Sequence, residues 1–475
     1  MYEMVVGRMI QQKINYGRNY FIRLSDYSLL FRMANRTFAY GYNIYRNMIL
    51  RAKNDGIRYS LNMDEQVATV KKCIDMEREG EVVIPEWFFH EGIVYRVTKI
   101  GRDAFSWCEK LTAIAIPESV NSIEWGAFRF CCSLKSINIP KSVTSIADGA
   151  FYRCSSITAI NLPEGITSIG ECAFFCCRSL EDINIPKSVT NIGNAAFSGC
   201  HNLKDINIPK IITSIADGAF CGCDSLTTII IPEGVTSIGK LAFYDCSSLT
   251  SITLPEGMTS IGRKAFSGCS SLTNINIPAG VESIGSGAFF DCSCLTAIAV
   301  TEGNTVYDSR EGCNAIIETS SNTLIQGCAK TVIPESVTRI GDGAFYGCDS
   351  LKDINIPKSV TSIGKFAFSG LTSILIPKSV KNIGEYAFHG TGVTYLTILG
   401  KPTIEENAFT SCKKLTDIYC YSTEVPPAND ETFGNINEFG EFDPSHLTLH
   451  VPESAMEQYK NTAPWNRFGK IVAIK

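Results

Sequence analysis

The stretch that decides the fold is Leu203–Ser225, LKDINIPKIITSIADGAFCGCDS. Its neighbours in the chain match it position for position, so that an Ala-Phe pair recurs thirteen times between Ala104-Phe105 and Ala408-Phe409. Eleven cysteines each follow a Phe by three residues, and the first nine of these are spaced 23 residues apart. A fixed period of this length predicts a solenoid, in which one structural unit is stacked many times.

Within the unit, each segment has its own structural expectation. Leu-x-x-Ile-x-Ile has the spacing of a strand whose large residues point inward, and Pro209 ends that strand because it has no N–H to donate. Val-x-x-Ile-Gly is expected to turn the chain, with the Gly supplying a permissive backbone. We expect Ala-Phe-x-x-Cys to form one short helical or 3₁₀ turn. The predicted fold class is therefore a solenoid of about 13 coils of 23 residues, with caps at both ends.

Composition excludes several classes of protein. The chain has 475 residues, of which 45% are hydrophobic and 19% charged, and its net charge is -5. So few charges argue against a disordered chain and against a nucleic-acid binder that relies on bulk basicity. No run reaches the ~18 apolar residues of a membrane-spanning segment. No signal peptide is found either, since four cations interrupt the first thirty residues, Arg8, Lys13, Arg18 and Arg23.

The repeat L-x-x-I-x-I-P-x-x-V-x-x-I-G-x-x-A-F-x-x-C-x-x resembles the BspA-like, or Treponema pallidum-type, leucine-rich repeat over about residues 100 to 414. Residues 57–100 resemble the N-terminal cap strands of that family. Residues 447–452, with Tyr459, Trp465 and Phe468, resemble its bacterial C-terminal cap. The resemblance implies a cell-surface or secreted, non-enzymatic protein that serves in adhesion or ligand binding. We expect an extracellular protein, matrix or polysaccharide partner, and no cofactor, metal or nucleic acid.

We divide the chain into four parts: 1–55, a basic and poorly ordered N-terminal segment; 56–102, an N-terminal β cap; 103–414, the solenoid, with a variant long coil at 295–333; and 415–475, a C-terminal cap. Residues 1–55 carry a net charge of about +6 and seven Tyr, so a nucleic-acid-binding or membrane-binding arm is the alternative interpretation there. The variant coil is expected to contain a hairpin around Ser320-Ser321-Asn322, either as a binding element or as a tolerated insertion. Ser454-Ala455-Met456-Glu457 predicts a capping box that starts a helix.

The regular cysteines admit three interpretations, namely disulfides, a metal or redox site, and buried core residues. We favour the core interpretation, because Leu371 and Thr391 replace the cysteine in two coils and free Cys is among the most buried residue types. No catalytic motif occurs among the five His, and strand spacing places His446 and His450 too far apart to share a metal ion.

The outward strand positions carry the functional hypothesis. Stacked strands place their polar side chains in parallel rows, which suit many weak hydrogen bonds to an extended ligand. The candidate ligand-binding residues are Asn138, Asn161, Asp182, Asn184, Asp205, Asn207, Asn274, Asn276, Asp353 and Asn355. Two alternatives remain open. In one, Asn and Thr only bond along their own rows and keep the sheet soluble; in the other, the whole chain is a structural spacer without a ligand of its own.

Overall fold

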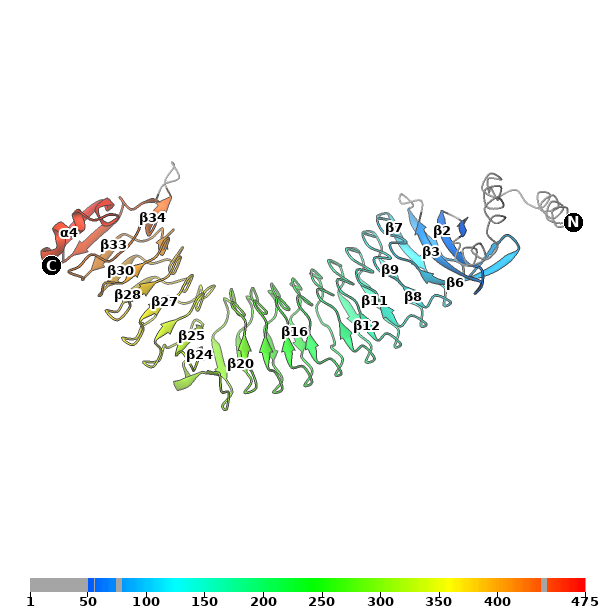
Figure 1. Cartoon of the computed structure of the whole chain (residues 1–475), viewed down its shortest axis with the longest axis horizontal. Coiled ribbons are helices and arrows are strands. Elements are labelled where there is room, and N and C mark those ends of the chain that lie inside the picture. The colour runs from blue at the N-terminus through cyan, green and yellow to red at the C-terminus, as the bar shows by residue number, and fades with distance from the viewer. Residues whose placement is uncertain (1–49, 55, 74–78, 437–441, 475) are drawn as a thin grey trace, which may run out of the picture.

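The computed structural model describes residues 50–54, 56–73, 79–436 and 442–474. They form a long, curved stack of about 16 turns with few helices, and the N-terminal strands and the helix α4 (Met456–Lys460) lie at opposite ends (Figure 1). The predicted solenoid is therefore confirmed, with more turns than the 13 expected. Of the predicted N-terminal segment 1–55, residues 1–49 and 55 lie outside the described residues, and the remainder forms β1 (Leu50–Asn54).

Each coil has three sides, and the first is formed by the Leu-x-x-Ile-x-Ile segment. Its strands pair in parallel and in register, so that Ala159, Ile160 and Asn161 of β11 lie beside Asp182, Ile183 and Asn184 of β13. Copies without an assigned strand, such as residues 203–208, interrupt the sheet. The strands on this side are β4 (Gly80–Val83), β7 (Leu111–Ala115), β9 (Ser136–Ile137), β11 (Ala159–Asn161), β13 (Asp182–Asn184), β16 (Thr228–Ile230), β18 (Ser251–Thr253), β20 (Asn274–Ile277), β22 (Ala297–Val300), β28 (Ser373–Ile376), β30 (Tyr395–Ile398), β33 (Asp417–Cys420), β36 (Thr448–Val451) and β37 (Lys470–Ala473).

The second side is formed by two-residue strands within Val-x-x-Ile-Gly. They also pair in parallel, with each Ile beside the Ile one coil away. These strands are β8 (Ser122–Ile123), β10 (Ser145–Ile146), β12 (Ser168–Ile169), β14 (Asn191–Ile192), β15 (Ser214–Ile215), β17 (Ser237–Ile238), β19 (Ser260–Ile261), β21 (Ser283–Ile284), β26 (Arg339–Ile340), β27 (Ser362–Ile363), β29 (Asn382–Ile383) and β31 (Thr403–Ile404).

The third side, which we call the turn side, corrects one expectation. The Ala-Phe-x-x-Cys segments are consecutive turns and not helical or 3₁₀ elements. The N–H of Phe174 donates to the carbonyl of Ala196 in the next coil (2.8 Å), whereas the N–H of Cys177 donates to Phe174 within its own coil (3.1 Å). A helix would use all such groups internally. Positive φ angles at Cys172 and Cys176 turn alternate N–H groups toward the neighbouring coil.

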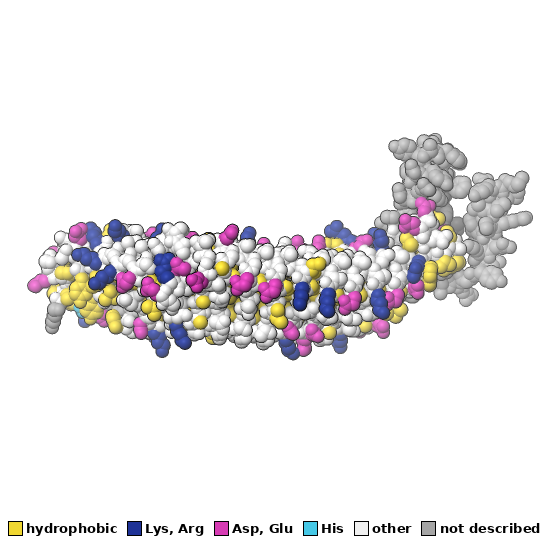
Figure 2. Space-filling view, turned by 90° about the horizontal axis from the view of Figure 1, so that it is seen from below, with side chains coloured by type: hydrophobic (Ala, Val, Ile, Leu, Met, Phe, Trp, Pro, Cys, Tyr) yellow, Lys and Arg dark blue, Asp and Glu magenta, His cyan; other side chains and the backbone are white. Residues whose placement is uncertain are grey.

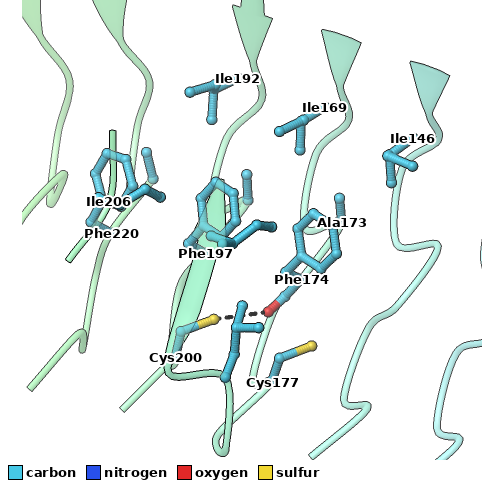
Figure 3. Packing of buried hydrophobic residues seen from close by; sticks show 14 of the residues in the cluster. Ile146, Ile169, Ala173, Phe174, Cys177, Ile192, Phe197, Cys200, Ile206 and Phe220 are labelled. Atoms are coloured by element: carbon cyan, nitrogen blue, oxygen red, sulfur yellow. Dashed lines mark hydrogen bonds between the residues drawn. The ribbon is translucent and has the colours of Figure 1, made fainter. Parts of the chain in front are cut away.

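The core consists of stacked copies of the same side chains (Figure 3). The Phe rings form a continuous ladder from Phe105 to Phe289, in which Phe174 and Phe197 have centroids 5.3 Å apart and planes 8° from parallel. A second ladder runs from Phe345 to Phe433. Offset stacking of this kind adds to the hydrophobic gain from burial, so each coil depends on its neighbours.

Close packing, and not backbone freedom, explains the recurrent Gly after the second-side strand. The φ angle of Gly193 is not positive, and a Cβ added there would lie 2.6 Å from the backbone N of Glu171 in the preceding coil. Gly170, Gly239 and Gly262 meet the preceding coil in the same way. Our expectation that Gly is needed here for its backbone freedom was therefore wrong. Gly is needed because the neighbouring coil leaves no space for a side chain.

The variant coil contains the predicted hairpin. Strands β24 (Ile316–Glu318) and β25 (Thr323–Gln326) are antiparallel, and β23 (Tyr307–Asp308) adds a third antiparallel strand. On the turn side this coil is shortened: the N–H of Gly327 bonds to the carbonyl of Ala344 (2.7 Å), but farther out the N–H of Asp291 bonds directly to the carbonyl of Tyr346 (3.3 Å). The buried residues accordingly fall into two clusters that meet at this coil, near the middle of the arc (Figure 1).

At the N-terminal end, five strands precede the first coil and join its second side; they pair antiparallel, except that Val67–Cys73 and Ile93–Ile100 pair in parallel. They are β1, β2 (Ile57–Asn62), β3 (Val67–Cys73), β5 (Trp87–His90) and β6 (Ile93–Ile100). We propose that they cap the stack, because they pair with β8 through β6 and bury Tyr59 and Phe88 against each other.

At the C-terminal end, Tyr459, Trp465 and Phe468 are buried, and the indole of Trp465 donates to the carbonyl of Pro426 (2.9 Å). The capping-box prediction was wrong: Ser454 lies inside the 3₁₀ turn η2 (Glu453–Ala455), and α4 begins without a side-chain cap. The remaining elements there are β32 (Phe409–Thr410), β34 (Phe433–Ile436), β35 (Phe442–Asp443) and η3 (Trp465–Arg467).

Candidate binding face

The outward surface of the first-side sheet, called the binding face below, is where the candidate residues lie. Parallel in-register pairing sets Asn138, Asn161 and Asn184 in one row over three successive coils. Asp182 starts a second row, beside Ala159 of the coil before it. All ten predicted residues are exposed, while the Ile residues that separate them along each strand are buried, apart from the partly buried Ile354. The alternation of a half-buried strand produces this separation.

Some of the candidate side chains already form hydrogen bonds within the protein. Asn207 accepts from the N–H of Ile185 (3.0 Å) and donates to its carbonyl (2.8 Å), so its amide replaces strand pairing at a coil that has no assigned strand. Asp205 accepts from the N–H of Ile206 (2.8 Å). Asn276 donates to Thr301 (3.0 Å). These three side chains therefore stabilise the sheet, and Asn207 has the least capacity left for a ligand.

A hydroxyl row lies along the same face. Thr250, Thr273 and Thr296 each donate to the carbonyl of the residue one coil earlier, at 3.3 to 3.4 Å. Thr394 and Thr416 repeat the pattern in the C-terminal coils. The reading in which polar residues bond along their own rows therefore holds for these Thr hydroxyls, which satisfy backbone groups of the neighbouring coil.

The C-terminal end of the face is apolar and aromatic, which our sequence analysis missed. Leu375 and Tyr395 are 48% and 49% exposed at outward positions of β28 and β30. Tyr419 stacks on His450, with centroids 4.2 Å apart. Hydrophobic side chains gather at this end of the molecule (Figure 2). Following the repeat register through Val393 and Leu415 would have found these residues, because they occupy the positions that carry Asn, Asp, Ser and Thr in earlier coils.

His450 is held in place by a carboxylate. Its Nε2 lies 2.8 Å from Asp417 Oδ1, and this hydrogen bond lowers the pKa of Asp417. Stacking on Tyr419 and pairing with Asp417 fix the imidazole on the sheet surface. A rigid Tyr-His-Asp group presents both an aromatic plane and polar edges, which is the composition of many binding surfaces.

The regular cysteines are core residues, as predicted. All eleven are buried and none forms a disulfide. Each thiol from Cys131 to Cys292 donates to the carbonyl of the Phe in the preceding coil, as Cys200 does to Phe174 (3.2 Å; Figure 3). Burial raises the pKa of Cys200, and raises that of Cys412 to about 11. Neutral, hydrogen-bonded thiols are poor metal ligands and poor nucleophiles.

Within the part of the chain that the structure describes, no group of three His, Cys, Asp or Glu is placed to hold a metal ion. Loss of hydration lowers the pKa values of His90 and His389. His201 pairs with Asp224 at the surface (2.9 Å). Among the described residues, none of the helices has the length and hydrophobicity that crossing a bilayer requires.

The stacked coils, their Phe ladder and the exposed polar strand face define a leucine-rich repeat solenoid. The family model for the BspA type leucine rich repeat region matches residues 92–204, 190–313 and 325–438. The chain therefore belongs to the BspA-type leucine-rich repeat family, a class of repeat proteins generally involved in protein interaction.

Two solved structures support the same fold. A leucine-rich repeat protein from Bacteroides ovatus is 26% identical, with a TM-score of 0.58, and the match covers 89% of this chain and all of that one. A leucine rich cell surface protein from Faecalibacterium prausnitzii is 27% identical, with a TM-score of 0.52, and the match covers 79% and 96% of the two chains. No curated protein matches the chain.

Proposed function

We propose that this protein is a non-enzymatic binding protein that holds a protein or glycan partner on its binding face. The observation that carries the proposal is the register of the sheet: exposed polar side chains recur in rows on rigid strands and give way to an exposed aromatic patch at one end. Such a surface combines many hydrogen-bonding groups with aromatic anchors, and little flexibility is lost on binding.

We further propose that the protein acts at the cell surface, in adhesion or in binding extracellular protein, matrix or polysaccharide. Membership of the BspA-type family supports this, together with the likeness to a protein described as a cell surface protein. Among the ten candidate residues, Asn138, Asn161, Asp182 and Asn184 are the contacts we favour most, because they lie in register on neighbouring coils.

The test is binding of the intact chain to an array of glycans and matrix proteins, followed by titration of each ligand found. Replacing Asn138, Asn161, Asp182 and Asn184 together by Ala should weaken binding at least about tenfold, since each lost hydrogen bond contributes about 0.5 to 1.5 kcal/mol. Tyr395→Ala with Tyr419→Ala should weaken it comparably if the ligand reaches the aromatic patch.

A matched control is Lys187→Ala with Lys210→Ala, which alters exposed residues at the corners after Pro186 and Pro209 and leaves the face intact. This variant should bind as the unchanged chain does. Binding that is unaffected by both face variants would contradict the proposal. If the intact chain binds nothing on the array, the spacer function becomes the better account.

A further inference from the structure

A compact group of arginines and aromatic rings lies on the turn side of the first three coils, away from the binding face. We call it the arginine–aromatic strip; its rings are Trp107, Trp125, Phe130 and Tyr152. Its cations are Arg102, Arg129 and Arg153, one from each successive coil. At the positions of Arg129 and Arg153, later coils carry either small residues, such as Ser198 with Gly199, or a ring without an arginine, such as Phe175, which stacks on Tyr152 (4.8 Å). The two arginines therefore set the strip apart from the rest of the repeat.

The rings form a connected surface. Trp107 stacks on Phe130 with centroids 3.8 Å apart, and Phe130 meets Tyr152 edge to face at 5.5 Å. Trp107 is 50% exposed. Half-exposed rings of this kind leave apolar surface available to a ligand.

The guanidinium groups lie over these rings. Arg102 is 4.3 Å from the centroid of Trp125, and Arg129 is 5.0 Å from Phe130 and 5.2 Å from Tyr152. Arg153 is 5.6 Å from Phe130. Six of the seven cation–π contacts among the described residues belong to this strip. A guanidinium that lies over a ring is held in position without its N–H groups being used.

One nearby carboxylate pairs with a guanidinium group of the strip, since Asp103 Oδ2 lies 3.7 Å from Nε of Arg102. Glu124 accepts from the backbone N–H of Arg102 (3.1 Å), and Asp148 accepts from that of Glu171 (2.8 Å). Within the described part of the chain, neither Arg129 nor Arg153 forms an ion pair, and Nε of Arg129 is buried without a hydrogen-bond partner. Rings therefore position the three cations, and their N–H groups are available to an anion from outside, except for the buried Nε of Arg129 and the Nε of Arg102 that pairs with Asp103.

We propose that the arginine–aromatic strip binds an acidic polysaccharide, whose carboxylate or sulfate groups pair with Arg102, Arg129 and Arg153 while its sugar rings lie against Trp107 and Phe130. Successive Phe rings set the coil spacing at 5.4 Å. An extended peptide presents side chains on one side every ~6.6 Å, which fits this spacing less well. The proposal does not depend on the binding face.

The experiment titrates the full chain with dextran sulfate and with polygalacturonate, using uncharged dextran as the comparison. Binding to at least one of the two acidic polymers, and none to dextran, is expected. Arg129→Gln with Arg153→Gln should weaken that binding at least about tenfold, because each change removes charge-assisted hydrogen bonds. Arg153→Gln alone, at an exposed side chain with little structural role, should weaken it about threefold or more.

The matched control is Lys240→Gln with Arg263→Gln, which removes two charges from the turn side of later coils where no ring lies beneath them. It should keep nearly full affinity. The proposal is overturned if neither acidic polymer binds, if the control loses as much affinity as the Arg129/Arg153 variant, or if poly-glutamate or vesicles of anionic lipid bind more tightly than both polymers. If only the Asn138/Asn161/Asp182/Asn184 variant loses affinity for a ligand, that result bears on the function proposed for the binding face and not on the arginine–aromatic strip.

Discussion

Cys200 shows how one residue position serves the whole stack. Its thiol is fully buried and donates to the carbonyl of Phe174 in the preceding coil, so it joins two coils at a point where no strand pairs. Thr391 replaces Cys in one coil, and its hydroxyl donates to Phe388 (2.8 Å). Cys and Thr each supply a small donor that tolerates burial, while the buried Leu371 shows that one coil stacks without a donor at this position.

Native-state alkylation tests this role. At pH 8, iodoacetamide should modify the exposed Cys294 first and the eleven regularly spaced cysteines, all buried, at least about a hundredfold more slowly, because the thiolate is the reactive form and burial both hides the thiol and raises the pKa of thiols such as Cys200. Peptide mass spectrometry with time gives each rate, and unfolding in urea should make all twenty cysteines reactive. Comparable rates for Cys200 and Cys294 in the folded protein would contradict the core assignment.

At the scale of the element, neighbouring coils are in close contact where the second-side strand ends. The recurrent Gly here has no room for a side chain, whereas Gly165, in the turn after Pro163, has no neighbour closer than 3.5 Å to an added Cβ. Neither Gly165 nor Gly193 has a positive φ angle. Comparing substitutions at the two positions therefore distinguishes the effect of close contact between coils from that of backbone conformation.

Gly193→Ala should therefore lower the free energy of unfolding by about 1 to 3 kcal/mol, the usual cost of overpacking. Gly165→Ala should change it by no more than about 0.5 kcal/mol, since it adds a methyl group at an uncrowded exposed site. Urea unfolding followed by circular dichroism measures both variants. Equal losses would show that conformational freedom, and not contact with Glu171, is what Gly193 provides.

At the scale of the whole molecule, the free energy of unfolding is a sum of contributions from the stacked coils. The buried thiols make this free energy depend on pH. Nine of the eleven regularly spaced cysteines have pKa values raised by burial: Cys154, Cys177, Cys200, Cys223, Cys246, Cys269, Cys292, Cys348 and Cys412. These pKa shifts arise only when the folded coils enclose each thiol and remove it from water.

The protein should become less stable as pH rises above about 8.5. The unfolded chain then loses thiol protons that the folded chain keeps, so each such Cys costs about 1.4 kcal/mol per pH unit until the pH reaches its folded pKa. For Cys348 that limit is about 12 and for Cys412 about 11. Below pH 8 the full contribution is present.

Cys200→Thr isolates this contribution from other groups that titrate in the same range. Its free energy of unfolding should fall less steeply between pH 8.5 and 10.5 than that of the unchanged chain, by about the slope of one thiol. Urea unfolding at several pH values measures the difference. Parallel curves for the two proteins would show that Cys200 ionises as readily in the folded chain as in the unfolded one.

The sequence by itself determined the solenoid, the buried Leu, Ile, Phe and Cys positions, the exposed rows such as Asn161 and Asn184, and the hairpin near Ser321. These follow from period and alternation, which are local properties repeated in every coil. The tertiary structure decided what depends on contact between coils. It showed that the Ala-Phe segment bonds to its neighbour and is not a helix, that Gly193 is needed for space, and that Asn207 is bound to backbone. It also brought Arg129, Phe130 and Tyr152 together, because residues 23 apart become neighbours only when the coils stack.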